Sequence, residues 1–345
     1  LITGAAGGLG CSLVKFLLAK GYNIIAIDNN FRKKFFGEDG SVGEKFNFLK
    51  ENTNFFETDI RDNAQLSKIF DLYGRGLNII CHYAAQPSHD WAARNPQLDF
   101  NINAAATLSL LELVRQYCPD SPFIFSSTNK VYGDSPNYIP LRKEETRYEF
   151  DDDHYQTGIG EGQTIDQSTH SVFGASKVAA DIMVQEYGKY FHMPTVCFRA
   201  GCLTGISHSG AELHGYLQYI VKCAVENKHY NIFGYEGRQV RDQIDFYDVA
   251  SAAYAFSKNP RFGEVYNIGG GYENSISVLE TINNLEERGY KLDYEYRENA
   301  RIGDHIVYYT DMSKFKNDFP EWKITKNVNN IIDEMIKGLV SRKKT

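Results

Sequence analysis

A glycine-rich turn at the start of the chain constrains its fold more than any other feature. A short apolar strand end runs through a T-G-x-x-G-x-x-G motif into a predicted helix over residues 11–20. Glycines at positions 4, 7 and 10 allow a tight turn, close approach of the backbone to a pyrophosphate, and close packing of the helix on the strand. The helix start also offers unbonded N–H groups and a partial positive charge. The motif predicts a dinucleotide site at the first strand-to-helix turn.

The chain then alternates short apolar runs with helical patterns. The predicted strands are 1–3, 24–28, 54–57, 78–82, 122–127 and 194–199, and the helices between them include 97–117 and 171–191. Such alternation indicates parallel strands joined by right-handed crossovers. We predict an α/β fold, a Rossmann-type doubly wound parallel sheet with a smaller C-terminal α/β lobe. Its expected division is a nucleotide-binding domain over 1–200 and mainly a substrate lobe over 201–345, with some segments returning to the first domain.

Asp28 ends the second predicted strand, 18 residues after Gly10. An acidic residue at about this distance accepts hydrogen bonds from the adenosine ribose, and a carboxylate suits a free 2′-hydroxyl rather than a 2′-phosphate. This favours NAD over NADP. Arg32 keeps the alternative open, because an arginine nearby can accommodate the phosphate of NADP.

Bulk properties exclude several classes of function. The net charge is −7, from 37 basic and 44 acidic residues, which argues against binding to nucleic acid or to an anionic membrane. Six widely spaced cysteines form no C-x-x-C pair and are typical of reduced core residues in a cytoplasmic protein. No apolar stretch reaches the roughly 18 residues of a membrane span. Because residue 1 already lies in the glycine motif, we expect that a few residues precede it.

Residues 134–169 interrupt the alternation with a polar, acidic segment rich in turn formers. It lies between the strand that carries Thr128 and the helix that carries Lys177, so we expect it to roof the active site. His154 follows three aspartates, but hard-metal loops place their ligands at alternate positions around a turn glycine. We therefore predict a solvated loop and no metal site.

The segment over residues 170–181, H-S-V-F-G-A-S-K-V-A-A-D, resembles the Tyr-x-x-x-Lys helix of the extended short-chain dehydrogenase/reductase family. In that family the tyrosine is the general acid/base, and the lysine lowers its pKa and holds the cofactor ribose. Here Lys177 is present, but Phe173 replaces the tyrosine. Three explanations stay open: another residue is the base, the residue was substituted to trap a complex, or the protein binds without catalysing.

Candidates for another base are Tyr132, His170, Cys202 and His208. The resemblance further implies that Thr128 holds the reacting sugar oxygen. Nucleotide-sugar 4,6-dehydratases carry an acidic pair after that hydroxyl, whereas this chain has Asn129 and Lys130, so dehydration is disfavoured.

The segments Q-P-S-H-D-W-A at 86–92, G-C-L-T-G at 201–205 with H-S-G-A-E-L-H-G at 208–215, and R-Q-V-R-D at 238–242 resemble the CDP-tyvelose (CDP-paratose) 2-epimerase group. This implies C2 epimerisation of a CDP-linked deoxyhexose through transient oxidation by bound NAD. A nucleotide-sugar 4-epimerase, a dehydrogenase or reductase, and a binding module without activity are the alternatives. Arg241 and Arg301 match arginines that grip the diphosphate of the nucleotide sugar.

The resemblance implies two sets of binding residues. The cofactor set is Gly4, Gly7, Gly8, Leu9, Gly10, Asp28, Asn29, Arg32, Asp59, Ile60, Ala84, Ala85, Gln86, Asn103, Ser126 and Lys177. The substrate set, for a CDP-sugar or else a UDP-sugar, is Gln86, His89, Thr128, Cys202, His208, His214, Arg241 and Arg301. A homodimer or homotetramer is also expected, built on the helices predicted over 97–117 and 171–191.

Overall fold

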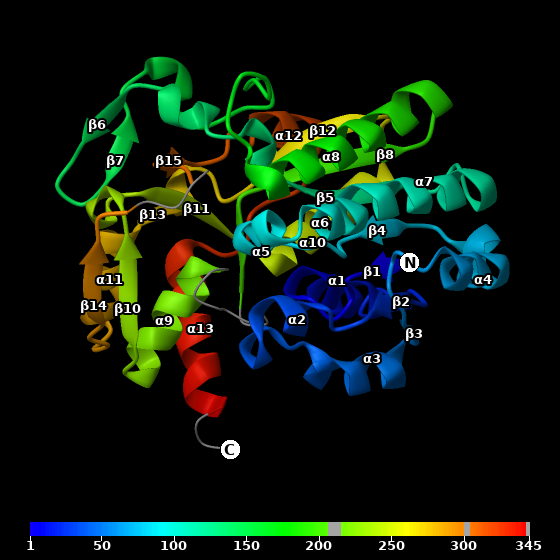
Figure 1. Cartoon of the computed structure of the whole chain (residues 1–345), viewed down its shortest axis with the longest axis horizontal. Coiled ribbons are helices and arrows are strands. Elements are labelled where there is room, and N and C mark those ends of the chain that lie inside the picture. The colour runs from blue at the N-terminus through cyan, green and yellow to red at the C-terminus, as the bar shows by residue number, and fades with distance from the viewer. Residues whose placement is uncertain (206–214, 300–303, 343–345) are drawn as a thin grey trace.

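The computed structural model describes residues 1–205, 215–299 and 304–342. Its central element is a seven-stranded parallel sheet with the strand order β12-β8-β5-β4-β1-β2-β3 (Figure 1). The strands are β1 (Ile2–Thr3), β2 (Ile25–Asp28), β3 (Asn54–Glu57), β4 (Ile80–His82), β5 (Phe123–Thr128), β8 (Thr195–Ala200) and β12 (Glu264–Ile268). The predicted doubly wound α/β fold is confirmed. The strand order reverses between β1 and β4, and ligands of such sheets bind at the carboxyl ends of the strands at this point.

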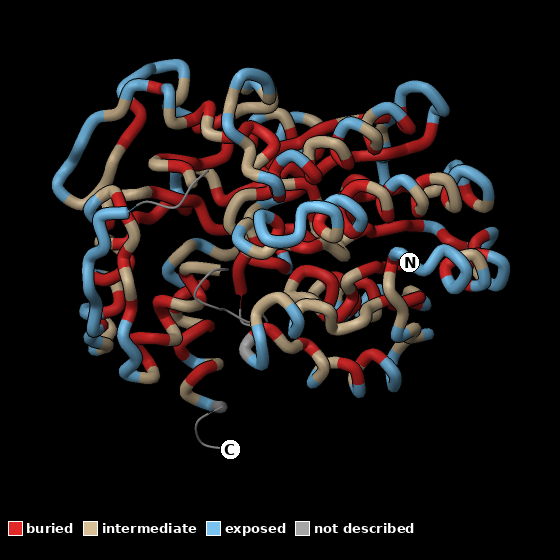
Figure 2. Tube along the Cα trace, in the orientation of Figure 1, coloured by how far each residue is buried: buried red, intermediate tan, exposed pale blue. Residues whose placement is uncertain are grey.

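Helices cover both faces of this sheet because successive side chains of a strand point to opposite faces. Ala26 faces one core, with α1 (Gly8–Leu18), α3 (Phe46–Asn52), α10 (Phe246–Lys258) and α12 (Ser313–Asp318). Ile25 and Ile27 face the other core, with α4 (Asn63–Tyr73), α7 (Ala106–Tyr117) and α8 (Ser171–Phe191). Figure 2 shows the central strands buried between these layers.

A second lobe lies beside the sheet (Figure 1). It contains the pair β10 (His229–Phe233) and β14 (Asp293–Arg297), and a small sheet of β13 (Ser275–Ser277), β11 (Val240–Asp245) and β15 (Val307–Tyr308). Helices α9 (Tyr216–Glu226), α11 (Val278–Glu287) and α13 (Val328–Arg342) enclose its own apolar core. Strand β9 (Cys202–Thr204), which directly follows β8, pairs with the end of β11 and joins the two lobes.

The helix predicted over 97–117 is interrupted. It consists of α6 (Pro96–Phe100), a π-helical turn at Asn101–Ala105, and α7. The wider turn holds Asn103 against the chain after β4, where its amide donates to the backbone carbonyl of Gln86 and to Ser176 Oγ. Tertiary hydrogen bonds therefore accompany the break in an otherwise regular helical pattern.

The insertion over residues 134–169 contains the hairpin β6 (Leu141–Lys143) and β7 (Tyr148–Phe150). Its apolar residues, such as Phe150 and Ile159, pack on Tyr308 and Tyr309 of the second lobe. None of residues 134–169 lines the cavity described below. The prediction that this segment roofs the active site is therefore wrong. Burial of its aromatic residues against the second lobe instead holds its strand β7 beside β15.

Candidate active site

One cavity of about 840 Å³ runs along the carboxyl ends of the central strands. At one end it is lined by the glycine-rich turn and Asp28, and at the other by Tyr216, Phe233 and Arg241 of the second lobe. It thus joins the predicted cofactor site to the predicted substrate lobe, with the ends of β5 and α8 between them.

The glycine-rich turn forms a cradle that only glycine fits. Gly4 has φ +68°, and a Cβ there would lie 2.7 Å from the backbone nitrogen of Ala84. A Cβ on Gly10 would overlap the carbonyl oxygen of Gly4. Gly7 precedes α1 without any side-chain cap, so the first N–H groups of the helix stay available to an anion in the cavity. This geometry fits the pyrophosphate of a dinucleotide.

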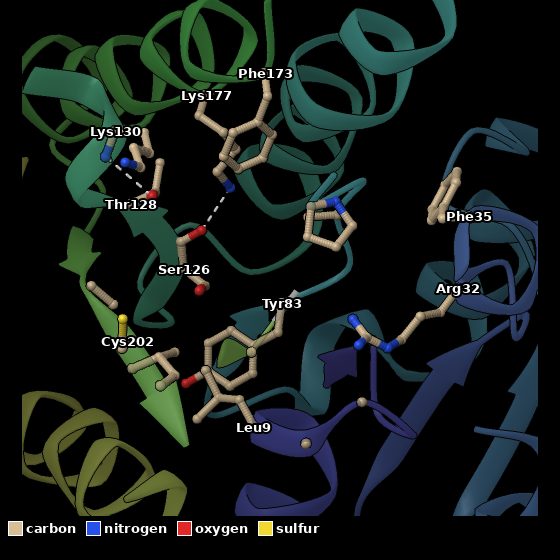
Figure 3. Close-up of a pocket in the computed structure, with 18 of the residues that line it drawn as sticks. Leu9, Arg32, Phe35, Tyr83, Ser126, Thr128, Lys130, Phe173, Lys177 and Cys202 are labelled. Carbon is tan, nitrogen blue, oxygen red and sulfur yellow. Dashed lines mark hydrogen bonds between the residues drawn. The ribbon is translucent and has the colours of Figure 1, made fainter. Parts of the chain in front are cut away.

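Asp28 and Arg32 both line the cavity beside this turn. The two Asp28 oxygens accept hydrogen bonds from the backbone nitrogens of Ala6 and Asn30, each at 2.9 Å, which fixes the carboxylate at the end of β2. Burial raises the pKa of Asp28, and these N–H donors oppose the shift. The Arg32 guanidinium lies 4.7 Å from the Phe36 ring and points into the cavity (Figure 3).

The remaining residues at this end divide into lining and supporting groups. The cavity is lined by further members of the predicted cofactor set, namely Gly8, Leu9, Asn29, Asp59, Ile60, Ala84 and Ala85. Asp59 accepts from Asn29 Nδ2 at 3.0 Å and pairs with both nitrogens of the Arg61 fork. These contacts hold the loop after β3 against the loop after β2.

Gln86 and Asn103 are buried and do not line the cavity. The Asn103 amide exchanges hydrogen bonds with both backbone groups of Gln86, and both side chains donate to Asp99. The predicted direct contacts with cofactor or substrate are therefore corrected. These two side chains position the segment 84–88, whose neighbouring residues Ala84, Ala85 and Pro87 line the cavity.

A buried histidine ties the two strands that flank the switch point. His82 contacts Thr3 Oγ1 through Nδ1 at 2.7 Å and Thr107 Oγ1 through Nε2 at 2.9 Å. Thr107 donates its own proton to the Asn103 carbonyl, so it accepts from Nε2–H and His82 accepts from Thr3. Burial lowers the pKa of His82 to about 3, so the imidazole stays neutral in this series of hydrogen bonds.

Lys177 and Phe173 project from α8 toward Ser126 and Thr128 at the end of β5 (Figure 3). The Lys177 Nζ donates to the Ser126 carbonyl at 2.6 Å and lies 4.0 Å from the centre of the Phe125 ring. Burial lowers the pKa of Lys177 to about 8. Phe173 is 7% exposed and lines the cavity where the family's phenol is expected. Thr128 lines the cavity too, and its hydroxyl accepts from the Lys130 backbone nitrogen.

The structure removes two predicted base candidates. The Tyr132 hydroxyl is buried and donates to Asn267 Oδ1 at 2.7 Å. Both ring nitrogens of His170 contact backbone carbonyls, those of Ser168 and Val131. Neither residue lines the cavity. Cys202 does line it, but burial raises the pKa of its thiol to about 11, so it holds its proton at neutral pH. His208, together with His214 and Arg301, lies outside the described residues.

At the substrate end, Arg241 and Lys130 share one carboxylate. Asp304 Oδ1 accepts from Arg241 at 2.7 Å and from Lys130 Nζ at 3.3 Å. Burial alone raises the pKa of Asp304, but the two cations hold it well below its usual range. All three side chains line the cavity, so the cluster places two cationic groups at this end of it. The motifs gave no sign that Asp304 and Lys130 meet, since they lie 174 residues apart.

Sequence reasoning also missed a contact on the cavity wall. His89, predicted only as a substrate contact, lies 3.0 Å from Ser171 Oγ through its Nδ1. Its ring lies 4.8 Å from the Phe173 ring, centre to centre. Both His89 and Ser171 line the cavity. Only the pairing of α8 with α5 (His89–Arg94) brings them together.

Comparisons with known proteins agree with this geometry. The chain is 34% identical over 332 residues to the CDP-paratose 2-epimerase of Salmonella typhi, covering 92% of each chain. It is 27% identical over 314 residues to a putative UDP-glucose 4-epimerase of Methanocaldococcus jannaschii, covering 91% of this chain and 90% of that one.

Among solved structures, the UDP-glucuronic acid 4-epimerase of Bacillus cereus in complex with UDP-glucuronic acid and NAD has the same fold. The TM-score is 0.78 at 23% identity, with 99% of this chain and 98% of that chain covered. Residues 1–269 match the NAD dependent epimerase/dehydratase family. The chain therefore belongs to this family, and its cofactor is NAD.

Proposed function

We propose that the protein is a nucleotide-sugar epimerase that inverts C2 of a CDP-linked deoxyhexose. The observation that carries the proposal is the single cavity that joins the glycine-rich turn to Arg241 past Thr128 and Lys177. Such a cavity accepts NAD and a nucleotide sugar end to end, with the sugar at the ends of β5 and α8. When bound, NAD would supply the acceptor for hydride from the sugar carbon, and rotation of the sugar would let the hydride return to the opposite face.

The chain's own residues bind and orient these two molecules. Gly4, Gly7 and Gly10 would hold the pyrophosphate of NAD, and Asp28 would accept from its ribose. Lys177, which now donates to Ser126, would donate to the ribose next to the nicotinamide. Thr128 donates to the oxygen of the reacting sugar carbon, which stabilises the charge that develops on that oxygen.

Two observations favour epimerisation at C2 over related reactions. Asn129 and Lys130 follow Thr128, so no carboxylic acid stands there to move the protons that loss of water requires. The Salmonella relative bears the name CDP-paratose 2-epimerase. The C4 reaction in the name of the Methanocaldococcus relative is the competing outcome.

Product stereochemistry tests the proposal. The purified protein is incubated with CDP-paratose, CDP-glucose or UDP-glucose, and the sugar products are identified by NMR. We expect inversion at C2 of the CDP-deoxyhexose, without net NADH in solution. Inversion at C4 of UDP-glucose identifies a 4-epimerase instead, stoichiometric NADH identifies a dehydrogenase, and nucleotide binding with no conversion identifies a binding module.

Replacement of Arg241 by alanine tests the diphosphate contact. We expect CDP to bind about 1.5–3 kcal/mol more weakly, the range for a hydrogen bond to a charged group. The content of bound NAD should stay unchanged, because its pyrophosphate lies at the glycine-rich turn. Calorimetric titration with CDP measures the effect, and Arg142→Ala, an exposed arginine of the hairpin β6–β7, is the control. Unchanged CDP affinity in Arg241→Ala would remove this arginine from the proposed site.

We further propose a homodimer formed by α7 and α8. Large exposed apolar side chains gather on α6, α7 and α8: Phe100, Leu108, Val172, Ile182, Tyr190 and Phe191. An exposed apolar surface of this kind is typical of a protein interface, and a two-fold axis buries the same surface of both copies.

The double substitution Leu108→Glu and Ile182→Glu is therefore expected to yield monomers, because it buries charge at the interface without touching the core. Light scattering of the purified variant measures the mass. Leu72→Glu, which places the same charge at an exposed apolar residue of α4, should leave the assembly intact. A double variant with the mass of the wild type would place the interface elsewhere.

No described helix is long and apolar enough to cross a membrane, and a cytoplasmic location stays a prediction.

A further inference from the structure

His89 and Ser171 form a hydrogen-bonded pair on the cavity wall beside Phe173. They are 82 residues apart in sequence and are the first residues of α5 and α8. The His89 ring packs against the ring of Phe173 at 4.8 Å. Since Phe173 stands where the family's acid/base tyrosine is expected, the pair lies next to the position of the missing phenol.

The hydrogen bonds of Ser171 Oγ can be counted. A serine hydroxyl has one proton to donate and two lone pairs to accept with. Gly174 N–H donates to one lone pair at 3.3 Å. When the hydroxyl proton is donated to His89 Nδ1, at 3.0 Å, the second lone pair is left to accept a proton from a molecule in the cavity. Ser171 lines that cavity with His89 behind it as the acceptor.

The backbone of Ser171 is held in an unfavourable conformation. Its φ is +61°, in the left-handed region, where a residue other than glycine costs roughly 1–3 kcal/mol. A serine that only capped α8 would not need this φ, since N-cap residues favour extended backbone. The residue with this conformation contacts both His89 and Gly174. Backbone strain of this kind is concentrated at active sites.

Cys202 and Lys177, which also line the cavity, are poorly suited to accept a proton at neutral pH. Cys202 is a thiol, and Lys177 is mostly an ammonium that has no lone pair, since its pKa is about 8. An imidazole nitrogen that lacks a proton has a lone pair with which it can accept one.

We propose that Ser171 and His89 form a proton relay that replaces the missing phenol in the proposed epimerase. As hydride leaves the sugar carbon, the O–H bond of its hydroxyl breaks and the proton passes to Ser171 Oγ. Ser171 passes its own proton to His89 Nδ1, which gives an imidazolium. The sugar has then lost one hydride and one proton and has become a ketone, and return of both restores the hydroxyl. The charge balances because the cofactor loses one positive charge when it is reduced and the imidazole gains one.

The relay rests on the proposed function, and its test begins with His89→Gln and Ser171→Ala of the full chain with bound NAD, assayed with CDP-paratose. We expect kcat to fall roughly 10²–10⁴-fold in His89→Gln, the usual contribution of a general base. NAD content and CDP affinity should stay at the wild-type level. His154→Gln, an exposed histidine of the insertion, is the matched control and should keep full turnover.

Two rescues separate proton transfer from a structural role. Added imidazole should restore turnover to His89→Ala. Phe173→Tyr introduced into His89→Gln should restore most of the lost turnover, because it returns a phenol beside Lys177. A readout that needs no turnover is the ¹⁵N spectrum of the histidine side chains. The His89 Nδ1 signal should be that of an acceptor in the wild type and should shift in Ser171→Ala.

Three results would overturn the relay. Wild-type kcat in His89→Gln or in Ser171→Ala overturns it while the proposed epimerase stands. Loss of activity that neither imidazole nor Phe173→Tyr restores, with an Nδ1 signal unmoved by Ser171→Ala, assigns His89 a structural role. If the wild type converts none of the nucleotide sugars, the proposed function fails, and the relay that rests on it fails too.

Discussion

Replacement of Lys177 by methionine is expected to lower kcat by about 10²–10³-fold, the usual effect of removing one preorganised donor. Methionine fills a similar volume among Phe125 and α8, but it cannot donate to Ser126 or to a cofactor ribose. Steady-state kinetics with the nucleotide sugar measure the loss. Lys189→Met, an exposed lysine on the same helix, is the control. Wild-type kcat in Lys177→Met would contradict a role for this lysine in the reaction.

The same lysine sets an expected pH dependence. Burial lowers its pKa to about 8, so the charged form is lost as the pH rises through that value. We expect kcat/KM of the wild type to fall above pH about 8. In Lys177→Arg this fall should move to a higher pH. In the unfolded chain the lysine titrates near 10.5. Below pH about 8 the buried charge of Lys177 therefore lowers the free energy of unfolding by its full amount. This penalty disappears as the pH rises from about 8 to 10.5.

Replacement of Asp181 by alanine should lower the free energy of unfolding by about 3–5 kcal/mol, the range for breaking a buried ion pair. Asp181 and Arg199 are buried, and the Arg199 fork donates to both carboxylate oxygens, at 2.8 and 3.1 Å. Ser127 also donates to Asp181, and Arg199 donates to the Tyr132 hydroxyl. The alanine variant leaves the guanidinium of Arg199 buried without its counter-charge.

Urea unfolding of Asp181→Ala measures this effect. Asp151→Ala, which breaks the exposed pair with Arg142, serves as the control and should unfold with the wild-type midpoint. Because Ser127 directly precedes Thr128 on β5, we also expect lower turnover in Asp181→Ala at temperatures where it remains folded. An unfolding free energy within about 1 kcal/mol of the wild type would show that this network does not hold the ends of β5 and β8.

Local patterns in the sequence predicted the fold and the centre of the site. The glycine spacing and the alternation of apolar runs give the parallel sheet and its first turn, because backbone conformation and burial repeat over short distances along the chain. The helix predicted over 171–191 is α8 with the same ends. Thr128 and Lys177 line the cavity as expected. Their positions could be predicted because each belongs to a motif that fixes its place, at a strand end or on a helix face.

The proton-transfer groups could not be predicted in this way. Tyr132 and His170 are near the right place in sequence, but their side chains turn into the protein to bond Asn267 and backbone carbonyls. The directions of side chains in irregular segments depend on which polar groups become buried together, and burial of an unpaired polar group is costly. The π-helical turn that positions Asn103 has the same origin.

What the sequence by itself determined is therefore the doubly wound sheet, the dinucleotide turn and the replacement of the phenol by Phe173. Only the tertiary structure decided that the insertion packs on Tyr308 and Tyr309 away from the cavity, and that His89 meets Ser171 beside Phe173. The physical reason is distance along the chain. Periodicity fixes neighbours three or four residues apart, whereas α5 and α8 come into contact only when distant parts of the chain pack together in the fold.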